Sequence, residues 1–540
     1  MSATDLIRSQ VMWNRLIAIV EEQALVLVRA SFSTSTREAG DLSAGVFDRQ
    51  GRMLAQSVTG TPGHVNSMAA SVMHFLDEFP IETMEPGDIY LTNDPWKGTG
   101  HLYDVVVVTP VFRSDGERSV PVALFACTSH MTDIGGVGFG MSGTEVYHEG
   151  LYLPLIRFAR NGEFDETVMR IIRANTRTPD MVEGDIYSLT ACNERGVLRL
   201  IEMMDEFALE DLDGLADHII DKSRDAMLRL IGDLPHGTWH NSMRLDGVDE
   251  PIDLVAAMTV DETGIDIDFT GTSPQSRVGI NVPMTYTDAY TSFGVRCIVG
   301  PDVPNNSGSL GVVRVTAPEG TILNAPHPAA VNVRHVVGQM LPDTVFGCLA
   351  QILPDRVPAE GTSSLWNILI DGHSADGEQY IVMSFHSGGA GARPAADGLS
   401  ATAFPSGVRN MPVEINEAIS PIVFWRKEFR PDSGGDGKYR GGHGQILEIG
   451  NREGLPFSIS ATYERTVHPA RGRDGGGSGA LGRLRLKNGG EEVKPLGRST
   501  IAGDDRLVMH FPGGGGFGDP AERDSGQILA ERRDGLVGHP

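Results

Sequence analysis

The sequence predicts an α+β protein that is divided into several domains. The chain has 540 residues, which is longer than the size at which a single hydrophobic core usually stops growing. Its 40% hydrophobic and 21% charged residues are typical of an ordinary globular protein. Helical patterns, strand-like patterns and glycine-dense stretches occupy separate blocks of the chain, which favours the α+β class.

The first predicted domain, residues 1–237, combines a long N-terminal helix with a mixed, β-rich region. Apolar residues recur at near-helical spacing over residues 5–30, where Asp5 is available as a cap. Two short apolar segments within residues 41–56 flank an Asp-Arg-Gln-Gly turn and predict a hairpin. Residues 85–160 alternate β-rich runs with glycine-rich connections, which predicts strands that carry long irregular loops. Three helical patterns follow before the domain ends.

The second predicted domain, residues 238–430, is an α+β region. It mixes short strands with a helix expected over residues 336–353, in which Pro342 marks a start or a kink. In residues 431–540, glycine becomes dense between short alternating strands, which predicts a β-rich C-terminal region. The glycine-rich run at residues 512–520 is expected to be a structural turn, because no clear strand and helix flank it as in an anion-binding loop.

Composition excludes several classes of partner. The chain carries 45 basic and 71 acidic residues, a net charge of −26, so we expect no binding to nucleic acid. Its four cysteines lie far apart without a CxxC pair, which argues against a disulfide framework and a thiolate zinc site. The sequence has neither an apolar run long enough to span a membrane nor a secretory leader pattern. A cytoplasmic protein without a membrane partner is therefore expected.

The residues best suited to chemistry lie on loops next to predicted strands. His101 and Asp104 form an HxxD pair directly before a run of four valines, and residues three apart point to opposite faces of a regular strand. Gly98 and Gly100 relax the backbone just upstream, so an irregular loop could bring both side chains to one ion. A second histidine, His130, closes the next predicted strand.

Two carboxylates complete this set. Asp41 precedes the predicted hairpin, and Asp133 follows His130 in a glycine-rich loop. Neutral imidazole and carboxylate oxygen suit a divalent transition metal such as Zn, Mn or Fe, with one position left for water. Such a metal produces hydroxide near neutral pH. HxxD pairs also serve as capping or hydrogen-bonding groups, so spacing alone leaves a structural role open.

Other catalytic motifs are scarce. The sequence contains no GxxxxGK[ST] loop for ATP and no GxSxG nucleophile elbow. His386 and Arg393 stand in a glycine-rich segment and could bind a carboxylate or a phosphate. The same pattern is also typical of a structural turn with a hydrogen-bonded histidine.

Nine segments, in order along nearly the whole chain, resemble the hydantoinase B family. This family comprises the B subunits of N-methylhydantoinase and 5-oxoprolinase-type enzymes and is related to caprolactamase and to components of acetone and acetophenone carboxylases. The segments are REAGDLSAGVFDRQGRMLAQ, TPGHVNSM, NDPWKGTGHLYDVVVVTPVF, SHMTDIGG, EGLYLP, GTSPQSRVGIN, MPVEINE, RPDSGGDGKYRGGHG and PGGGGFGDP.

The resemblance implies a specific set of site residues. The presumed metal ligands are Asp41, His101, Asp104 and His130. The candidate catalytic residues are Glu38, Asp133 and His386, of which the first two are also alternative ligands or supporting groups. Where the family usually has two adjacent histidines, this chain keeps His130 and has Met131 next to it, and Tyr103 replaces the usual proline of Thr-His-Leu-Pro-Asp. We expect Tyr103 to alter loop rigidity or substrate shape.

The resemblance also accounts for the missing P-loop. In the resembling enzymes ATP and Mg are held by a separate hydantoinase A-type ATPase subunit, which phosphorylates the amide oxygen, and the B component supplies metal-activated water. We therefore expect a hetero-oligomeric, ATP-dependent hydrolase of small cyclic amides such as hydantoin, oxoproline or a lactam. One alternative is a component of an ATP-dependent ketone carboxylase, and another is a scaffold that has lost its chemistry.

Overall fold

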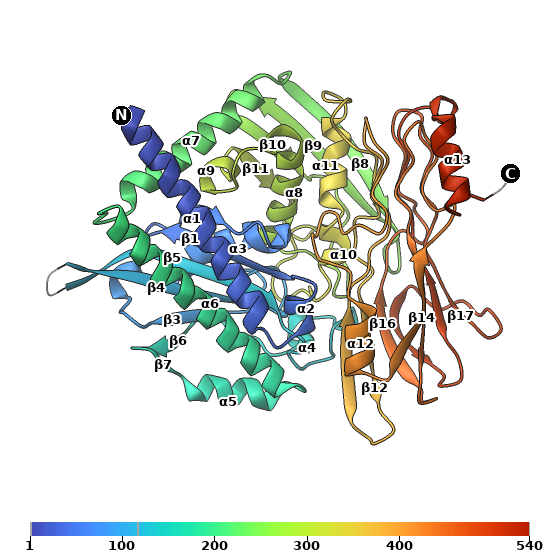
Figure 1. Ribbon diagram of the computed structural model, residues 1–540, viewed down its shortest axis with the longest axis horizontal. Coiled ribbons are helices and arrows are strands. Elements are labelled where there is room, and N and C mark those ends of the chain that lie inside the picture. Colours follow the sequence, from blue (N-terminus) through green and yellow to red (C-terminus); the bar gives the residue numbers. More distant parts are fainter. Residues whose placement is uncertain (1–2, 116–117, 539–540) are drawn as a thin grey trace.

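The computed structural model describes residues 3–115 and 118–538. It confirms the predicted α+β class, because helices and four separate sheets occur in the described part of the chain. The N-terminal and middle regions lie side by side, and the β-rich C-terminal region packs along one flank of both (Figure 1). Across the described residues, no helix is both long and apolar enough to cross a lipid bilayer.

The N-terminal region is built on a seven-stranded antiparallel sheet. In spatial order its strands are β2 (Met53–Gln56), β1 (Leu42–Asp48), β5 (Arg118–His130), β4 (Asp104–Asp115), β3 (Ile89–Thr92), β6 (Ile156–Arg160) and β7 (Glu163–Phe164). Strands β1 and β2 form the predicted hairpin. Because β4 and β5 are antiparallel neighbours, the start of β4 and the end of β5 lie at the same edge of the sheet.

Helices cover both faces of this sheet (Figure 1). One face packs against α1 (Ala3–Ala30), α6 (Pro179–Glu206) and α7 (Asp213–Gly232), and the other against α3 (Pro62–Glu78). Adjacent residues of β1 follow the alternation of a strand, since Val46 lies in the cluster with α1 and Phe47 in the cluster with α3. Helix α1 confirms the predicted N-terminal helix.

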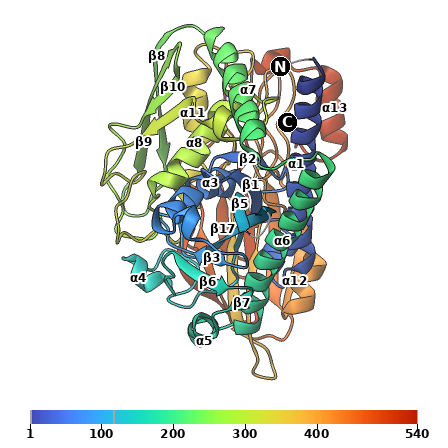
Figure 2. The same ribbon diagram turned by 90° about the vertical axis from the view of Figure 1, so that its left-hand side faces the viewer.

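The middle region contains a four-stranded sheet that packs against helices (Figure 2). Its strands in spatial order are β11 (Val313–Thr316), β10 (Gly264–Asp268), β9 (Ile252–Asp261) and β8 (Gly237–Leu245), and its helices are α8 (Met284–Val299) and α11 (Leu341–Leu349). The single helix predicted over residues 336–353 is wrong, because α10 (His335–Gly338) and α11 are separate. Pro342 lies in the first turn of α11, where its missing N–H breaks no helical hydrogen bond.

Two four-stranded antiparallel sheets form a sandwich in the C-terminal half. The first contains β13 (Gln379–Ser384), β12 (Ile368–His373), β16 (Phe457–Thr462) and β18 (Leu496–Ile501), and the second β14 (Ile422–Phe429), β15 (Gln445–Asn451), β19 (Leu507–His510) and β17 (Arg483–Leu486). Their facing side chains share one apolar cluster. Each sheet pairs strands from both sides of residue 430.

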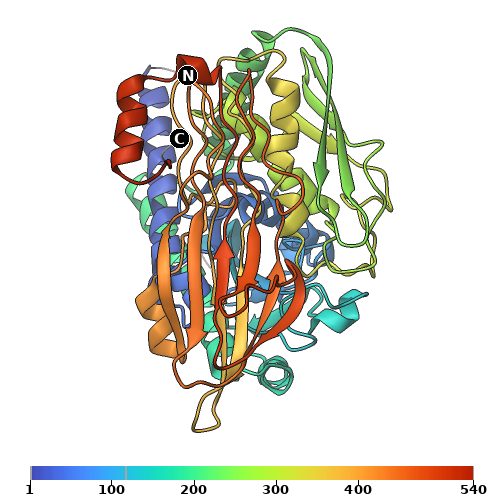
Figure 3. The same cartoon turned by 90° about the vertical axis from the view of Figure 1, so that its right-hand side faces the viewer.

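Glycine-rich segments extend beyond one end of the sandwich as closely packed chains (Figure 3). Residues 512–516, expected to form a turn, are instead extended, and the N–H groups of residues 514–516 donate to backbone carbonyls of neighbouring segments. A Cβ atom on Gly513 would lie 1.8 Å from the Ser433 carbonyl oxygen, so only glycine fits there. Since these N–H groups are already used, the run does not form an anion cradle.

The remaining helices are short or peripheral. They are α2 (Thr34–Arg37), α4 (Val146–Glu149), α5 (Glu166–Asn175), α9 (Ser307–Leu310), α12 (Val413–Ile419) and α13 (Ser525–Arg533), with two 3₁₀ turns at Ile81–Thr83 and Pro520–Glu522. Helix α2 stands directly before β1, and α4 follows the glycine-rich loop after β5. Both therefore border the edge of the N-terminal sheet at which the predicted ligands gather.

Candidate metal centre

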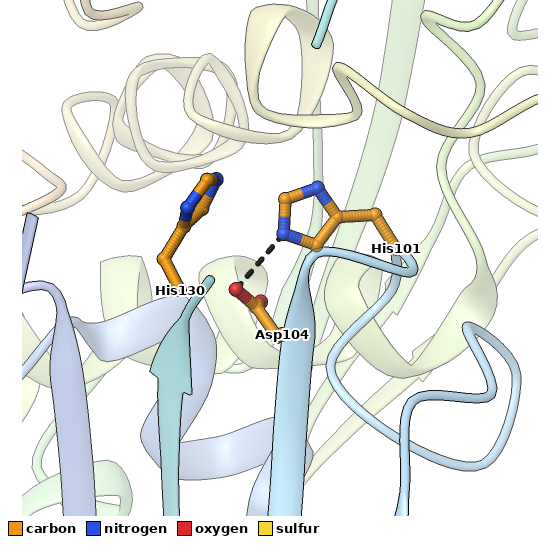
Figure 4. A group of neighbouring side chains, drawn as sticks. All are labelled: His101, Asp104 and His130. Atoms are coloured by element: carbon orange, nitrogen blue, oxygen red, sulfur yellow. Dashed lines mark ion pairs between the residues drawn. The ribbon is translucent and has the colours of Figure 1, made fainter. Parts of the chain in front are cut away.

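Three of the predicted ligands meet at one edge of the N-terminal sheet. Asp104 is the first residue of β4, His130 is the last residue of β5, and the two are direct cross-strand partners. Directly opposed residues of an antiparallel pair project to the same face. His101 reaches the same point from the loop before β4, as Figure 4 shows. The ligand atoms of His101, Asp104 and His130 all lie within 4.8 Å of one another.

The loop that carries His101 is irregular, as the sequence predicts. Gly100 has a φ of +95°, and a Cβ atom there would lie 2.7 Å from the Arg334 side chain. The Asn93 side-chain amide donates to the Leu102 carbonyl at 2.8 Å. This bond closes the loop around His101 and lets residues three apart converge, which a regular strand would prevent.

Asp41 lies close to this group and is connected to it by an unpredicted histidine. The Thr61 hydroxyl donates to the Asp41 carboxylate at 3.0 Å. His64, in the first turn of α3, lies between two carboxylates: its Nδ1 is 3.5 Å from Asp41 Oδ1 and its Nε2 is 3.0 Å from Asp104 Oδ2. The sequence signal for His64 was its place in the TPGHVNSM segment, which gave no indication of its position between the carboxylates.

One oxygen of Asp104 is fully engaged by neighbouring donors. Asp104 Oδ2 accepts from the Thr99 hydroxyl at 2.7 Å and from the Arg334 guanidinium at 2.6 Å. Arg334 is buried, donates to the Thr99 carbonyl, and lies 4.0 Å from the centre of the Tyr286 ring. The sequence pattern gave no indication of Arg334, which comes from the middle region. These contacts fix the carboxylate and leave its second oxygen directed at His101.

The contact between that second oxygen and His101 fits a metal ion. His101 Nδ1 lies 2.8 Å from the Asn332 carbonyl oxygen, which can only accept, so Nδ1 carries the proton. The other ring nitrogen, Nε2, then presents a lone pair to Asp104 Oδ1 at 2.9 Å. Among the described residues, neither atom has a hydrogen-bond partner. Two buried acceptors that face each other are unfavourable alone and suited to a shared cation.

The electrostatics of the cluster favour the same ion. Burial lowers the pKa of His101 to about 4 and that of His130 to about 3, so both imidazoles are neutral. Burial alone would raise the pKa of Asp104, but the positive charges of its neighbours His64 and Arg334 favour the ionised carboxylate and hold the pKa well below its usual range. Burial raises the pKa of Asp41. Neutral imidazoles beside an ionised carboxylate are the form that binds a metal.

The cavity at the centre of the cluster is small, and its lining combines polar side chains with the apolar Phe139, Leu365, Phe385 and Val408. Its volume is about 20 Å³, enough for one ion or one water molecule. Asp41, His101 and His130 line it from the N-terminal region, His335 lines it from the middle region, and Leu365 and Phe385 line it from the two ends of the β12–β13 hairpin of the sandwich. The site therefore forms where the three regions meet.

The three candidate catalytic residues lie outside this cavity. Glu38 is partly exposed and pairs with Arg37 at 2.9 Å. Asp133 is buried, pairs with Arg177 at 2.6 Å and lines a separate, larger cavity. His386 is buried at the end of β13, 3.0 Å from the Ser384 hydroxyl. The structure thus brings together His101, Asp104 and His130 and places Asp41 beside them at the same cavity. It does not bring the three candidate catalytic residues to them.

Comparison with known proteins agrees with the sequence resemblance. The hydantoinase B/oxoprolinase family model matches residues 5–520. The chain belongs to the hydantoinase B/oxoprolinase family. A family relative, the putative B subunit of a D-/L-hydantoinase from a Pseudomonas species, is 30% identical over 561 residues, which cover 99% of this chain and 93% of the relative.

Solved structures extend the family likeness to the fold. The crystal structure of ATP-dependent caprolactamase from Pseudomonas jessenii is 25% identical and matches with a TM-score of 0.89, over 99% of this chain and 95% of that one. A nucleotide-free structure of acetone carboxylase matches with a TM-score of 0.86 at 19% identity, over 98% of this chain and 78% of that one. The second likeness shows a shared fold only.

Proposed function

We propose that this hydantoinase B/oxoprolinase family member is the metal-dependent catalytic subunit of an ATP-dependent hydrolase of small cyclic amides. The observation that carries the proposal is the pair of unpartnered acceptors on His101 and Asp104, which lie 2.9 Å apart beside His130. Support for the substrate class comes from the names of the relatives, a hydantoinase and a caprolactamase. Hydantoin, oxoproline and lactam rings all contain the amide in question.

A divalent transition metal, Zn, Mn or Fe, would be held by Asp41, His101, Asp104 and His130, and when bound it supplies an acidified water near neutral pH. The surrounding residues orient these groups. The Asn332 carbonyl fixes the tautomer of His101, and such outer contacts strengthen metal binding. Phe139 and Phe385 supply apolar surface to the lining of the cavity, and a site that excludes water strengthens the electrostatic interactions inside it.

We place ATP and Mg on a partner, a hydantoinase A-type ATPase subunit. This chain has no P-loop sequence, one relative is named as the B subunit of a hydantoinase, and a matched structure is an ATP-dependent enzyme. An unstrained amide is a poor electrophile, so phosphorylation of its oxygen in one protein followed by attack of water in the other replaces one high barrier by two lower ones. The chain alone should therefore have no hydrolase activity.

Metal analysis of the purified protein tests the site. We expect close to one equivalent of a transition metal after reconstitution and a loss of about 100-fold in zinc affinity for His101→Ala, because one coordinating nitrogen is removed. Folding of the variant is checked by circular dichroism. Less than about a tenth of an equivalent in the wild-type protein would sink the metal assignment.

The substrate class needs the partner. Co-expression with an adjacent A-type subunit should give a stable complex that releases ADP in the presence of hydantoin, oxoproline or a lactam, while the separated proteins should not. If the complex turned over a ketone with bicarbonate and did not turn over any cyclic amide, the carboxylase alternative would replace the hydrolase proposal. Neither activity in a metal-loaded complex would favour the scaffold.

A further inference from the structure

A second cavity lies directly beside the ion cavity. Its volume is about 210 Å³, and its lining includes Tyr103, Val137, Phe139, Leu369, Asp371 and Arg498. Phe139 lines both cavities. The second cavity has exposed residues at its rim, since Val137 is 50% exposed and Arg498 is also exposed in its side chain. The two spaces are therefore neighbours, and one reaches the protein surface.

The sizes of the two cavities differ in a way that limits their occupants. The ion cavity, about 20 Å³, holds an ion or a water molecule and no organic group. The second cavity, about 210 Å³, is roughly ten times larger and has room for several water molecules or one small ring. A ring held there could reach the ion only if the wall between the cavities moved.

That wall consists of two aromatic side chains packed against each other. The Phe139 ring centre lies 5.2 Å from that of Tyr103 and 5.4 Å from that of His130. Tyr103 in turn stacks on His130 at 5.2 Å. On its other side Phe139 stacks on His335 at 5.8 Å. Phe139 therefore separates the second cavity from the presumed ligand His130.

The backbone on both sides of Phe139 is glycine and is connected to the metal cluster. Gly138 and Gly140, on either side of Phe139, have φ values of +82° and +154°. Their carbonyls both accept from the side-chain amide of Asn332 at 2.9 Å. Asn332 is also the residue whose main-chain carbonyl orients His101. A change in the position of Phe139 is thus transmitted through one residue to a presumed ligand.

The lining of the second cavity is largely polar. Its polar side chains are those of Thr132, Asp133, Arg177, Asp371, Gln379 and Arg498, and Leu369 and Phe139 contribute apolar contact. Within the described residues, Asp371 Oδ1 is buried without a hydrogen-bond partner, while its other oxygen accepts from Arg498 at 2.6 Å. Arg498 has further N–H groups. One free acceptor and nearby donors, with some apolar surface beside them, match the N–H and C=O groups of a small cyclic amide.

We propose that the second cavity is the vestibule through which a small amide-bearing ring reaches the metal centre, and that Phe139 is the side chain that moves to admit it. This inference rests on the proposed metal function. Val137 forms the outer rim of the vestibule, and Phe139 forms its inner wall. Any small molecule that reaches the ion, a chelator included, should pass both residues.

Removal of bound zinc by the small chelator pyridine-2,6-dicarboxylate tests the vestibule without a substrate or a partner. The rate of zinc loss is measured against chelator concentration in the full-length chain, after rapid desalting. We expect Phe139→Ala to raise the second-order rate constant by about tenfold and Val137→Trp, which fills the rim, to lower it by about tenfold. Phe139→Leu, a milder change in the same direction, replaces Phe139→Ala if the latter folds poorly.

Two matched controls separate access from general loosening. Phe158 is a buried phenylalanine that lines neither cavity, and Val467 is an exposed valine elsewhere on the surface. Phe158→Ala and Val467→Trp should leave the rate constant within about threefold of wild type. Equal rate constants for all zinc-loaded variants would overturn the vestibule alone. Failure of the wild-type chain to bind zinc would overturn the metal function and the vestibule together.

Discussion

Two clusters of buried charged side chains lie in different parts of the molecule and are paired in different ways. The metal cluster comprises Asp41, His64, His101, Asp104 and His130. The arginine cluster, between α11 and the sandwich, comprises the buried Asp343, Glu360 and Arg465, and the exposed Arg471 contacts it from the surface. In it, Arg465 lies 3.3 Å from Glu360 and 3.9 Å from Asp343, and Arg471 donates to Glu360 at 2.6 Å. Both clusters are buried, so burial alone does not distinguish them.

The clusters differ in the atoms that remain without a partner. In the arginine cluster, one donor, Arg465 Nε, has no partner among the described residues. In the metal cluster, four atoms lack one, and they belong to His64, His101, Asp104 and His130. Opposite charges and hydrogen bonds complete the first cluster, which is the arrangement of a structural ion pair. The second has several nitrogen and oxygen atoms that converge without donors, which is the arrangement of a metal site.

The largest expected effect concerns the arginine cluster. Glu360→Ala leaves the buried Arg465 guanidinium without its nearest charged partner, so the free energy of unfolding should fall by about 3–5 kcal/mol. Chemical denaturation at pH 7 measures this change, with Glu360→Gln as a control that keeps hydrogen-bonding atoms. The zinc content of the folded protein should not change, because Glu360 does not line the ion cavity. A loss of zinc without a loss of stability would reverse the roles assigned to the two clusters.

A smaller effect on stability is expected for a substitution at His386. This residue tests the comparison of the two clusters, because it is a buried histidine whose Nδ1 has no partner among the described residues, as in the metal cluster. Within the described part of the chain, His386 belongs to no group of potential metal ligands, so His386→Gln should retain full zinc binding. Burial lowers the pKa of His386 to about 3, below the value of about 6.5 in an unfolded chain. The unfolded state therefore binds the proton more readily, and stability present above pH 6.5 is lost as the pH falls toward 3.

The measurement for His386 is the free energy of unfolding of the metal-free protein at pH 7 and pH 5. Over this interval the titration of His386 should lower the stability of the wild type by about 2 kcal/mol, and His386→Gln should lack this part of the decrease. If the stability of His386→Gln depended on pH as strongly as that of the wild type, the His386 ring would be protonated or exposed in the folded chain. Zinc loss in the variant would instead place His386 within the site.

Much of the fold could be predicted from local patterns. The helix that became α1 and the hairpin of β1 and β2 follow from periodicity and turn residues that lie within one short segment. The helix expected over residues 336–353 was wrong because the apolar run there is buried on all sides in two short helices, which periodicity does not separate. The packing of the glycine-rich segments around residues 512–516 depends on backbone contacts between distant parts of the chain, and glycine content alone does not specify these contacts.

The candidate site divides in the same way. His101 and Asp104 could be placed on an irregular loop because glycine and strand signals lie next to them in the sequence. Arg334 and Asn332 could not be identified, since they reach the cluster from the middle region, more than 200 residues away along the chain. Sequence patterns thus locate ligands near one another in the chain, and tertiary packing supplies the residues that hold and orient them.

The smallest expected effect distinguishes Glu38 from Asp41, three residues apart and on opposite sides of the boundary of the metal cluster. The Glu38 side chain is 25% exposed, and among the contacts of the described residues it pairs only with Arg37. Glu38→Gln should therefore change the free energy of unfolding by less than about 0.5 kcal/mol. It should also leave the zinc affinity unchanged. Asp41→Asn is the matched change inside the cluster, where the side chain lines the ion cavity, and should weaken zinc binding by at least about tenfold. Isothermal titration with zinc measures the zinc affinity of both variants, and chemical denaturation measures the stability of Glu38→Gln. If Glu38→Gln weakened zinc binding as much as Asp41→Asn, the α2 turn would have to move in the metal-bound protein, and the cluster would extend beyond the buried atoms that define it here.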